Sequence, residues 1–155
     1  MTDLEEAILL HRESLSLRPP SNPYHSSSLF SLANALREHF EKTGSMTDLE
    51  EAILLHRESL SFRPTPHPDR FDSLNDLAFA LQDHFITTGS MTGLDEAISM
   101  LHEGLSLSYA STHPRRLWAL ENLADILETR FKKNGNQSDF EQAAALRQEI
   151  LATSK

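Results

Sequence analysis

The chain has 155 residues, of which 39% are hydrophobic and 24% charged, and it carries a formal net charge of −9. This composition is ordinary for a folded domain and excludes wholesale disorder. The absence of cysteine excludes disulfides and thiolate chemistry. The acidic balance argues against binding to nucleic acid, and no apolar run approaches the ~20 residues that span a bilayer. We therefore expect a cytoplasmic protein that binds neither nucleic acid nor membrane.

The sequence repeats itself at a nearly fixed spacing. The segment MTDLEEAILLHRESLS occurs twice, 45 residues apart, and weaker copies begin at Met91 and Gln137. The first two blocks agree at 30 of 45 positions, and the single extra residue of the third block falls between Leu105 and His113, where we expect a loop. Periods of this length are typical of stacked helical repeats. We expect one repeat domain over residues 1–155, divided into blocks 1–45, 46–90 and 91–136 and a terminal helix in 137–155.

Each block predicts two helices, which we call the opening helix and the closing helix. A Thr-x-x-Glu capping box marks the start of the first opening helix at Thr2 and Glu5, where the hydroxyl and the acid would satisfy exposed backbone N–H groups. The equivalent positions are Thr47/Glu50, Thr92/Asp95 and Ser138/Glu141. We expect the opening helices to end near Pro19, Pro64 and Tyr109, and the two prolines cannot donate the next backbone bond. The first copy has a one-sided apolar stripe of Leu4, Ala7, Ile8 and Leu15.

The closing helices carry a cleaner apolar stripe. Its members lie 0, 3, 4, 7 and 11 residues from the first one. These offsets fall within an arc of roughly 100° around a helix, so one face is expected to be buried. The three stripes are Leu29, Leu32, Ala33, Leu36 and Phe40; Leu74, Leu77, Ala78, Leu81 and Phe85; and Leu120, Leu123, Ala124, Leu127 and Phe131. We expect Gly44, Gly89 and Gly135 to end these helices as left-handed caps. The pattern predicts an all-α fold of seven helices without strands.

These residues resemble the tetratricopeptide repeat (TPR) family. The pairs that match the Leu-Gly pair in the first helix of the family's unit are Leu32-Ala33, Leu77-Ala78 and Leu123-Ala124. The residues that match its small residue in the second helix are Ala7, Ala52, Ala97 and Ala143, and Pro19 and Pro64 match its closing proline. The family's usual period is about 34 residues, so this 45-residue form resembles a long variant. It is similar to kinesin-light-chain-type repeats, through His67-Pro68-Asp69, and to arrays in fungal nucleotide-binding signalling (NLR-like) proteins.

The resemblance implies a right-handed α-solenoid of antiparallel helix pairs, which is a TPR-like superhelix. It further implies a protein–protein interaction scaffold that binds a peptide or helix of a partner on a concave face formed by the closing helices. The family's clamp for a partner's C-terminal carboxylate uses Lys, Arg and Asn, and only Asn34 matches that set. The neighbouring positions hold Ser27, Asp72, Asp83, Glu121 and Glu128. We therefore expect no such clamp.

No residue pattern indicates catalysis, a cofactor or a metal. Two pairs of histidines occupy equivalent positions of successive blocks: His11 with His56, and His39 with His84. Equivalent positions of stacked helices lie on the order of 10 Å apart, which is too far to share a zinc ion. The pair His102-Glu103 begins like a metalloprotease motif, but Ser106 stands where the second histidine is needed. Phosphate loops and nucleophile elbows are also missing from the sequence. We expect a protein that is not an enzyme.

The candidate binding site lies on the side of the closing helices opposite the stripe. At about 100° per residue, Phe30, Phe79 and Trp118 fall within about 60° of each other on that side, where the near-identical blocks also diverge. The predicted partner-binding groove comprises Phe30, Asn34, Arg37, Asn75, Phe79, Gln82, Trp118, Glu121 and Asp125. Its aromatic anchors and acidic rim predict a protein or peptide ligand that is basic or apolar. The alternative is that these aromatic side chains only pack against a neighbouring repeat, or that the differences between the blocks are neutral.

The two ends of the repeat array predict an alternative function. The sequence begins with an opening helix, so Leu4, Ile8 and Leu15 lack the cover of a preceding closing helix. The last helix, 138–152, is rich in alanine and carries Arg147 where the other blocks have histidine or an apolar residue, so it resembles a cap. Repeats are stabilised by their neighbours, and an uncovered end is expected to fray or to pair with another chain. This pattern predicts a self-assembly module that forms a dimer or a domain swap.

Overall fold

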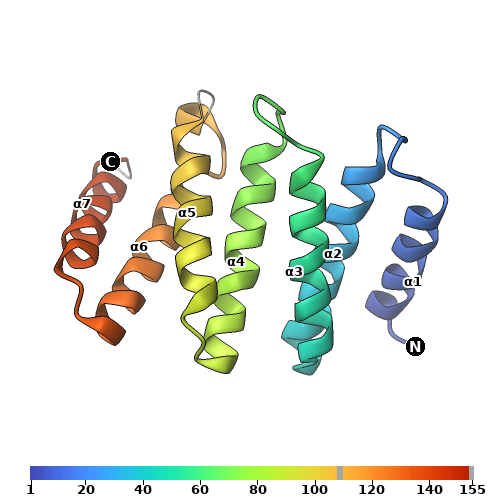
Figure 1. Cartoon of the computed structure of the whole chain (residues 1–155), viewed down its shortest axis with the longest axis horizontal. Coiled ribbons are helices and arrows are strands. Elements are labelled where there is room, and N and C mark those ends of the chain that lie inside the picture. Colours follow the sequence, from blue (N-terminus) through green and yellow to red (C-terminus); the bar gives the residue numbers. More distant parts are fainter. Residues whose placement is uncertain (108–109, 154–155) are drawn as a thin grey trace. The chain divides into compact units, whose positions relative to one another are not determined.

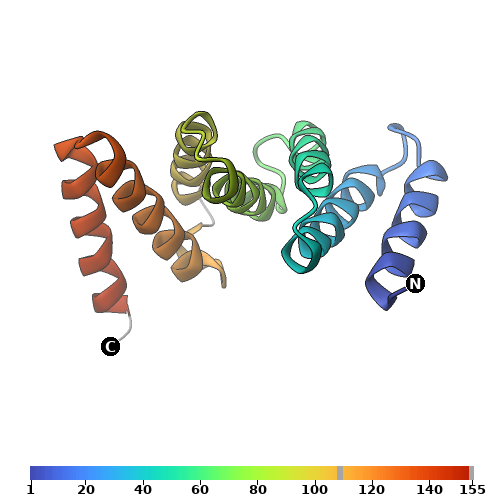
Figure 2. The same cartoon turned by 90° about the horizontal axis from the view of Figure 1, so that it is seen from below.

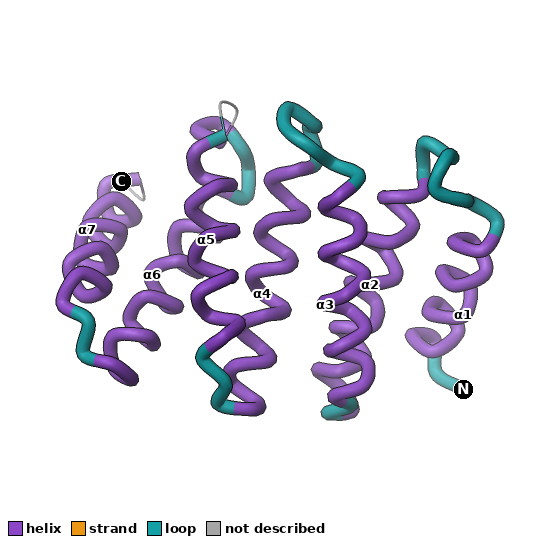
Figure 3. Tube along the Cα trace, in the orientation of Figure 1, coloured by secondary structure: helices purple, strands orange, loops and turns teal. Residues whose placement is uncertain are grey.

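The computed structural model describes residues 1–107 and 110–153, and every regular element in them is a helix (Figures 1 and 3). The α-helices in this part of the chain are α1 (Asp3–Ser16), α2 (His25–Thr43), α3 (Met46–Ser61), α4 (Arg70–Thr88), α5 (Thr92–Ser106), α6 (Arg116–Asn134) and α7 (Gln137–Thr153). A 3₁₀ helix, η1 (Ala110–Thr112), follows α5. For these described residues, the predicted all-α fold with seven α-helices is confirmed. Residues 108 and 109, within the segment expected to hold the extra residue of the third block, lie outside the described residues.

The chain forms two compact units, Met1–Ala80 and Leu81–Lys155, and α4 contributes its first part to one unit and the rest to the other. In the first unit, α2 packs against both α1 and α3. In the second unit, α6 packs against both α5 and α7, and η1 contacts α5 and α6. Consecutive helices within each unit run antiparallel, as Figures 1 and 2 show. The closing helices α2 and α6 are thus each in contact with two opening helices.

The apolar stripes of the closing helices form the core of both units. Leu29, Leu32 and Leu36 on α2 are each 1% exposed, and the equivalent leucines on α4 and α6 are also buried. Phe40 and Phe131, at the ends of their stripes, are partly exposed. Burial of one large apolar side chain contributes about 1.5–3 kcal/mol to folding, so these stripes dominate the stability of each unit.

The opening helices α1 and α3 share a sequence but differ in burial. Leu49 on α3 is fully buried, whereas its equivalent Leu4 on α1 is partly exposed. Ala52 of α3 packs into a core cluster on α2, and Ile8 of α1 packs into the same cluster. Of the three residues expected to lack cover, Ile8 is buried because it faces α2, and Leu4 and Leu15 stay partly exposed. The identical helices therefore differ because α3 packs more extensively on α2 than α1 does.

The helix starts confirm one capping box and correct another. Thr2 caps α1 as expected, because its Oγ1 accepts from the Glu5 N–H at 3.1 Å and Glu5 Oε2 accepts from the Thr2 N–H at 2.9 Å. The expected box at Thr47 and Glu50 is wrong. The N-cap of α3 is Ser45, whose Oγ accepts from the N–H of Asp48 at 3.4 Å, and Thr47 lies inside the helix. The helix restarts directly after the glycine cap of α2, which moves its start two residues earlier.

The two weaker capping boxes are also wrong, for the same reason. The N-cap of α5 is Met91, without a side-chain hydrogen bond, and Thr92 lies in the first turn. Helix α7 begins at Gln137, so Ser138 is again inside the helix. The side chain of Asn136 accepts from the N–H of Ser138 at 2.9 Å and satisfies one of the free donors at that helix start.

Glycine ends the closing helices, as the sequence predicts. Gly44, Gly89 and Gly135 have φ values of +74°, +76° and +70°. The N–H of each glycine donates to the carbonyl of the phenylalanine four residues earlier, at 2.7 Å. A left-handed residue at this position costs glycine little because it has no Cβ.

The connections between opening and closing helices are held by a repeated contact. Arg18 Nη1 donates to Ser28 Oγ at 3.0 Å, and the equivalent Arg63 Nη1 donates to Ser73 Oγ at 2.8 Å. In both blocks an arginine at the end of the opening helix therefore reaches the first turn of the next helix. This contact sets how the two helices of a pair are joined.

Candidate functional site

The nine predicted groove residues are divided between the two units. Those of the first unit are Phe30, Asn34 and Arg37 on α2, and Asn75 and Phe79 on α4. Those of the second unit are Gln82 on α4, and Trp118, Glu121 and Asp125 on α6. Each group makes contacts within its own unit, and these contacts differ between the two.

In the first unit, two side-chain pairs join α2 to α4. The guanidinium carbon of Arg37 lies 3.8 Å from the centroid of the Phe79 ring, and Arg37 Nη2 donates to Glu41 Oε1 at 2.6 Å. Asn34 Nδ2 donates to Asp76 Oδ2 at 3.2 Å. A guanidinium over an aromatic face is attracted by the ring quadrupole. Asn34, Arg37 and Phe79 are all partly exposed, so together they form a partly apolar surface that a ligand can reach.

Phe30 is more enclosed by its own chain than we expect for a residue that anchors a ligand. Its ring meets the ring of His56 on α3 edge to face, with centroids 5.6 Å apart and planes at 73°. The guanidinium carbon of Arg63 lies 4.8 Å from the centroid of the Phe30 ring. Arg63 is itself buried, and burial is the main cause that lowers its pKa. Phe30 therefore combines packing against a neighbouring helix with a partly exposed face.

Asn75 differs from the other predicted groove residues because it is fully buried. Neither its Nδ2 nor its Oδ1 has a hydrogen-bond partner among the described residues. The angular placement of Asn75 opposite the apolar stripe is not enough to expose it. We therefore leave Asn75 out of the surface that is proposed below to contact a partner.

In the second unit, the predicted residues on α6 form a mixed aromatic and acidic surface. The Trp118 ring is partly exposed, and the guanidinium carbon of Arg115 lies 4.6 Å from its centroid. Glu121 and Asp125 are exposed. Asp125 Oδ1 accepts from Arg147 Nη2 of α7 at 2.5 Å. Gln82, on the last part of α4, is partly exposed.

The sequence pattern alone does not indicate the arginines that stack on the predicted rings. Arg37, Arg63 and Arg115 lie over Phe79, Phe30 and Trp118, respectively. Arg63 could have been noticed, because it is the equivalent of Arg18 in the first block and precedes the same proline. Arg37 with Phe79 and Arg115 with Trp118 are partly exposed, so each of these two pairs can hold an apolar side chain or stack on a planar group.

A second repeated feature is a basic side chain held between two carboxylates from flanking opening helices. In the first unit, His39 Nδ1 of α2 donates to Asp48 of α3, and its Nε2 lies 3.7 Å from Glu5 of α1. In the second unit, the equivalent Arg130 of α6 pairs with Asp139 of α7 and Asp95 of α5. The hydrogen bond to Asp48 is the main cause that raises the pKa of His39. These clamps fasten three successive helices and are structural.

The described residues provide no arrangement that suggests metal chemistry or a membrane span. No three His, Asp or Glu side chains in residues 1–107 and 110–153 are placed to hold a metal ion. Among the same residues, no helix combines the length and the apolar character that crossing a bilayer requires.

Antiparallel helices that cover each other's apolar faces at a fixed period define the class of helical-repeat proteins. Residues 27–69, which span most of α2 and all of α3, match the model of the tetratricopeptide repeat family. Comparison with curated protein sequences gives no match. The resemblance to the tetratricopeptide repeat is therefore confirmed for this segment.

Solved structures extend the likeness over almost the whole chain. The nearly identical TPR-like repeats of a candidate kinesin light chain from Podosopora anserina align with a TM-score of 0.61 and 22% identity, covering 94% of this chain and 68% of that chain. A variant of that protein aligns with the same TM-score at 21% identity, covering 96% and 69%. The DHF58 filament aligns with a TM-score of 0.54 and 16% identity, covering 96% and 75%.

Identities this low show the fold alone, and that fold is a TPR-like helical repeat of the kind found in kinesin-light-chain-type arrays. Repeats with this fold generally mediate protein–protein interactions. The relation to fungal nucleotide-binding signalling proteins stays a prediction.

Proposed function

We propose that this protein is a non-enzymatic interaction scaffold that binds a peptide or helix of a protein partner on the surface of its closing helices. The observation that carries the proposal is the Arg37–Phe79 pair, which joins α2 to α4 and remains partly exposed. Aromatic and arginine side chains are the residues that most often dominate binding energy in interfaces. Trp118 with Arg115 provides a second surface of the same chemistry in the other unit.

The chemistry of these surfaces favours a ligand with an apolar anchor and basic flanks. The rings of Phe79 and Trp118 offer flat apolar area for an aliphatic or aromatic side chain. Glu121 and Asp125, which follow Trp118 on α6, carry exposed carboxylates. The net charge of the chain is −9. A basic ligand is therefore attracted to this surface over long range, and its binding weakens as salt is added.

Screening a peptide library against the full chain, followed by Phe79→Ala and Trp118→Ala, tests the scaffold proposal. We expect at least one variant to weaken binding of a selected peptide by about 10-fold or more, because truncating a hot-spot ring costs at least about 1.4 kcal/mol. Ile86→Ala is a matched control, since Ile86 is 70% exposed and lies outside the proposed surface. If both ring variants bind as the unmodified protein does, the closing helices are not the binding surface.

Self-assembly is a second candidate function, and the partial exposure of α1 favours it. Leu4 and Leu15 are partly exposed, and Leu9 and Leu10 are 54% and 58% exposed. Light scattering over a concentration series tests this candidate. We expect the average mass to rise with concentration if α1 pairs between chains, and a constant monomer mass would remove the candidate.

A further inference from the structure

The turn after α6 differs from the equivalent turns of the first two blocks in the residue that precedes the capping glycine. In those blocks the residue is a threonine, and the Oγ1 atoms of Thr43 and Thr88 each accept from the backbone N–H two residues later, at 3.2 Å. In the third block Asn134 Oδ1 accepts from the N–H of Asn136 at 3.0 Å. The hydrogen bond is thus kept, but the change creates an Asn-Gly pair at Asn134-Gly135.

An asparagine followed by glycine can lose its side-chain amide without an enzyme or a cofactor. Gly135 N attacks Asn134 Cγ, the Cγ–Nδ2 bond breaks, and the amide group leaves as ammonia with the proton from Gly135 N. Water then opens the resulting succinimide ring at either carbonyl, which yields aspartate or isoaspartate. Glycine has no Cβ to hinder the attack, and, apart from its chain neighbours, no described heavy atom lies within 4 Å of the point where a Cβ of Gly135 would stand. Both residues are exposed, so water can reach the ring.

The folded chain restrains this reaction through the cap of α6. The N–H of Gly135 donates to the carbonyl of Phe131 at 2.7 Å, so the attacking nitrogen keeps its proton while the helix end is closed. The reaction therefore proceeds from states in which the end of α6 has opened. Such states are most frequent where few buried contacts hold a helix end.

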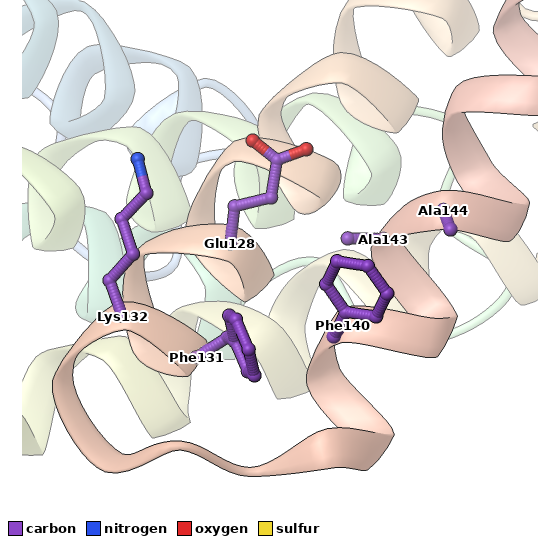
Figure 4. Close-up of a pocket in the computed structure, with 6 residues that line it drawn as sticks. All are labelled: Glu128, Phe131, Lys132, Phe140, Ala143 and Ala144. Carbon is purple, nitrogen blue, oxygen red and sulfur yellow. The ribbon is translucent and has the colours of Figure 1, made fainter.

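The end of α6 is loosely packed against α7. Next to it lies a cavity of about 330 Å³, lined by Glu128, Phe131, Lys132, Phe140, Ala143 and Ala144 (Figure 4). Figure 4 shows the rings of Phe131 and Phe140 beside the turn that joins the two helices, and their centroids lie 5.2 Å apart. Phe140 is 49% exposed, and Phe131 is partly exposed, whereas its equivalent on α4, Phe85, is 7% exposed. The aromatic contact at this helix end is thus open to solvent.

The cavity reflects a change of one residue in the last repeat. Ala144 occupies the position that Ile8, Ile53 and Ile98 hold in the other opening helices. The three isoleucines are buried, whereas Ala144 is exposed and lines the cavity. The smaller side chain removes apolar contact between α7 and the end of α6, so the opening of this end costs less free energy.

From these contacts, we propose that Asn134 is a site of spontaneous deamidation, controlled by the opening of the end of α6, and that the product loosens α7. The proposal is independent of the binding surface proposed above, because it uses only the turn between α6 and α7 and the packing of these two helices.

Both products disturb this turn. An aspartate at position 134 places a negative charge at the C-terminal end of α6, where the backbone carbonyls already carry partial negative charge. Lys132 and Lys133 lie in the same last turn and offset part of this charge. Isoaspartate has the larger effect, because it inserts one methylene group into the main chain, and only Gly135 and Asn136 separate α6 from α7. The ion pairs between α6 and α7 depend on that short link.

Incubation of the full chain in mildly alkaline buffer, followed by peptide mapping with mass spectrometry, tests the site. We expect Asn134 to convert in the native chain at least about 10-fold more slowly than in the chain unfolded in guanidinium chloride. Asn136 is the internal control: it is exposed and two residues away, but the side chain of Gln137 hinders attack, so it should keep its amide over the same period. Equal rates of Asn134 conversion in both states, or none in the native chain after prolonged incubation, would overturn the proposal, as would conversion of Asn136 at the same rate.

Two alanine substitutions test the role of the cavity. Ala144→Ile restores the residue of the other opening helices and is expected to slow the conversion of Asn134 in the native chain by at least about 5-fold. Ala145→Ile is the matched control, because Ala145 is exposed and does not line the cavity, so it should leave the rate unchanged. Equal rates in the two variants would show that packing against α7 does not control the reaction.

The effect of the product is measured on the deamidated chain itself, which ion exchange separates because it carries one more carboxylate. We expect the amide hydrogens of α7 to exchange at least about 10-fold faster in the isoaspartate form than in the unmodified protein. Asn134→Asp reproduces the aspartate form alone and is expected to have a smaller effect. Asn134→Thr carries the residue of the other blocks and should neither react nor alter the exchange. Unchanged exchange of α7 in the isoaspartate form would contradict the loosening of α7.

Discussion

At the scale of single residues, the two histidines in the middle of the first unit respond to pH in opposite directions. His56 is fully buried on α3, and neither of its ring nitrogens has a hydrogen-bond partner among the described residues. Burial lowers its pKa from 6.5 to about 4. The unfolded chain therefore binds a proton that the folded chain refuses, and the free energy of unfolding falls as the pH decreases from 6.5 toward 4, by about 3 kcal/mol in total.

Replacing His56 by Leu is expected to stabilise the protein. The third block has Leu101 at this position, and Leu101 is fully buried. The substitution removes two unpaired polar atoms, so we expect a gain of about 1–3 kcal/mol at neutral pH and the loss of the acid destabilisation described above. Urea denaturation at neutral and acid pH measures both effects. His11→Leu is the matched control: His11 has the same place on α1 and is partly exposed, so its replacement should change stability little.

The pKa shift of His39 gives stability the opposite pH dependence, and this effect acts where α1 contacts His39 through Glu5. Its pKa is raised by the hydrogen bond to Asp48 and, to a smaller extent, by Glu5. The stability that protonated His39 contributes is thus fully present below 6.5 and is lost as the pH rises through its folded pKa. We expect α1, which reaches this clamp through Glu5, to exchange its amide hydrogens more readily, as the pH rises through the folded pKa of His39, than intrinsic base catalysis explains. In His39→Gln this excess should be absent, and a pH response equal to that of the unmodified protein would contradict the role of His39.

At the scale of elements, the Arg130 clamp joins α6 to both α5 and α7 in the second unit. Arg130 donates to both oxygens of Asp139 at 2.7 Å, and Asp139 is fully buried, whereas the side chain of Asp95 is 69% exposed. We expect Asp139→Asn to lower the free energy of unfolding by about 2–3 kcal/mol, because one partner of a buried ion pair is lost. Asp95→Asn removes the exposed partner of the same arginine and should cost below about 1 kcal/mol. Equal losses in thermal denaturation would show that burial does not decide the strength of this clamp.

Two glycines at the helix ends make a matched pair for a second test. Gly135 has a φ of +70°, so Gly135→Ala is expected to destabilise the protein by about 1 kcal/mol. Gly93 lies in the first turn of α5 without a positive φ, and a Cβ there would meet Leu81 at an ordinary 3.5 Å. Gly93→Ala is therefore expected to stabilise by up to about 1 kcal/mol, because alanine favours the helix. Changes of the same sign in chemical denaturation would contradict the assignment of Gly135 as a left-handed cap.

The elements were predictable from the sequence to the extent that they repeat. The stripes and glycine caps follow from two periods, 3.6 residues and 45 residues, and both are visible in one sequence. The start of α3 was missed because Thr47 forms a plausible capping box while Ser45 follows the glycine more directly. The burial of Asn75 could not be predicted, since an angle around the helix does not tell which neighbour covers it. The Arg130–Asp139 pair could have been predicted, because alignment of the blocks places Arg130 at the position of His39 and Asp139 at the position of Asp48.

At the scale of the whole molecule, stability is expected to depend on the number of neighbours that a helix has. The sequence MTDLEEAILLHRESLS occurs in both α1 and α3, so intrinsic helix propensity is the same in both places. Only Ile8 is buried on α1, whereas α3 buries Leu49, Ala52, Ile53, His56 and Ser59. We expect amide hydrogens of α3 to be protected at least about 10-fold more than the same amides of α1, because local opening costs more where tertiary contacts are denser. Equal protection would show that propensity, rather than stacking, controls these helices.

The identity of α1 and α3 also has a consequence for how the chain chooses its topology. Both helices pack on α2, and their side chains alone cannot decide which of them takes which side of it. The connections differ: eight residues, 17–24, join α1 to α2, and only Gly44 and Ser45 join α2 to α3. The short link and its left-handed glycine restrict where α3 can go, and α1 must accept the side that is left. The side of α2 that each helix takes is thus decided by the two connections. Lengthening the link after Gly44 would allow a competing arrangement in which α1 and α3 exchange places.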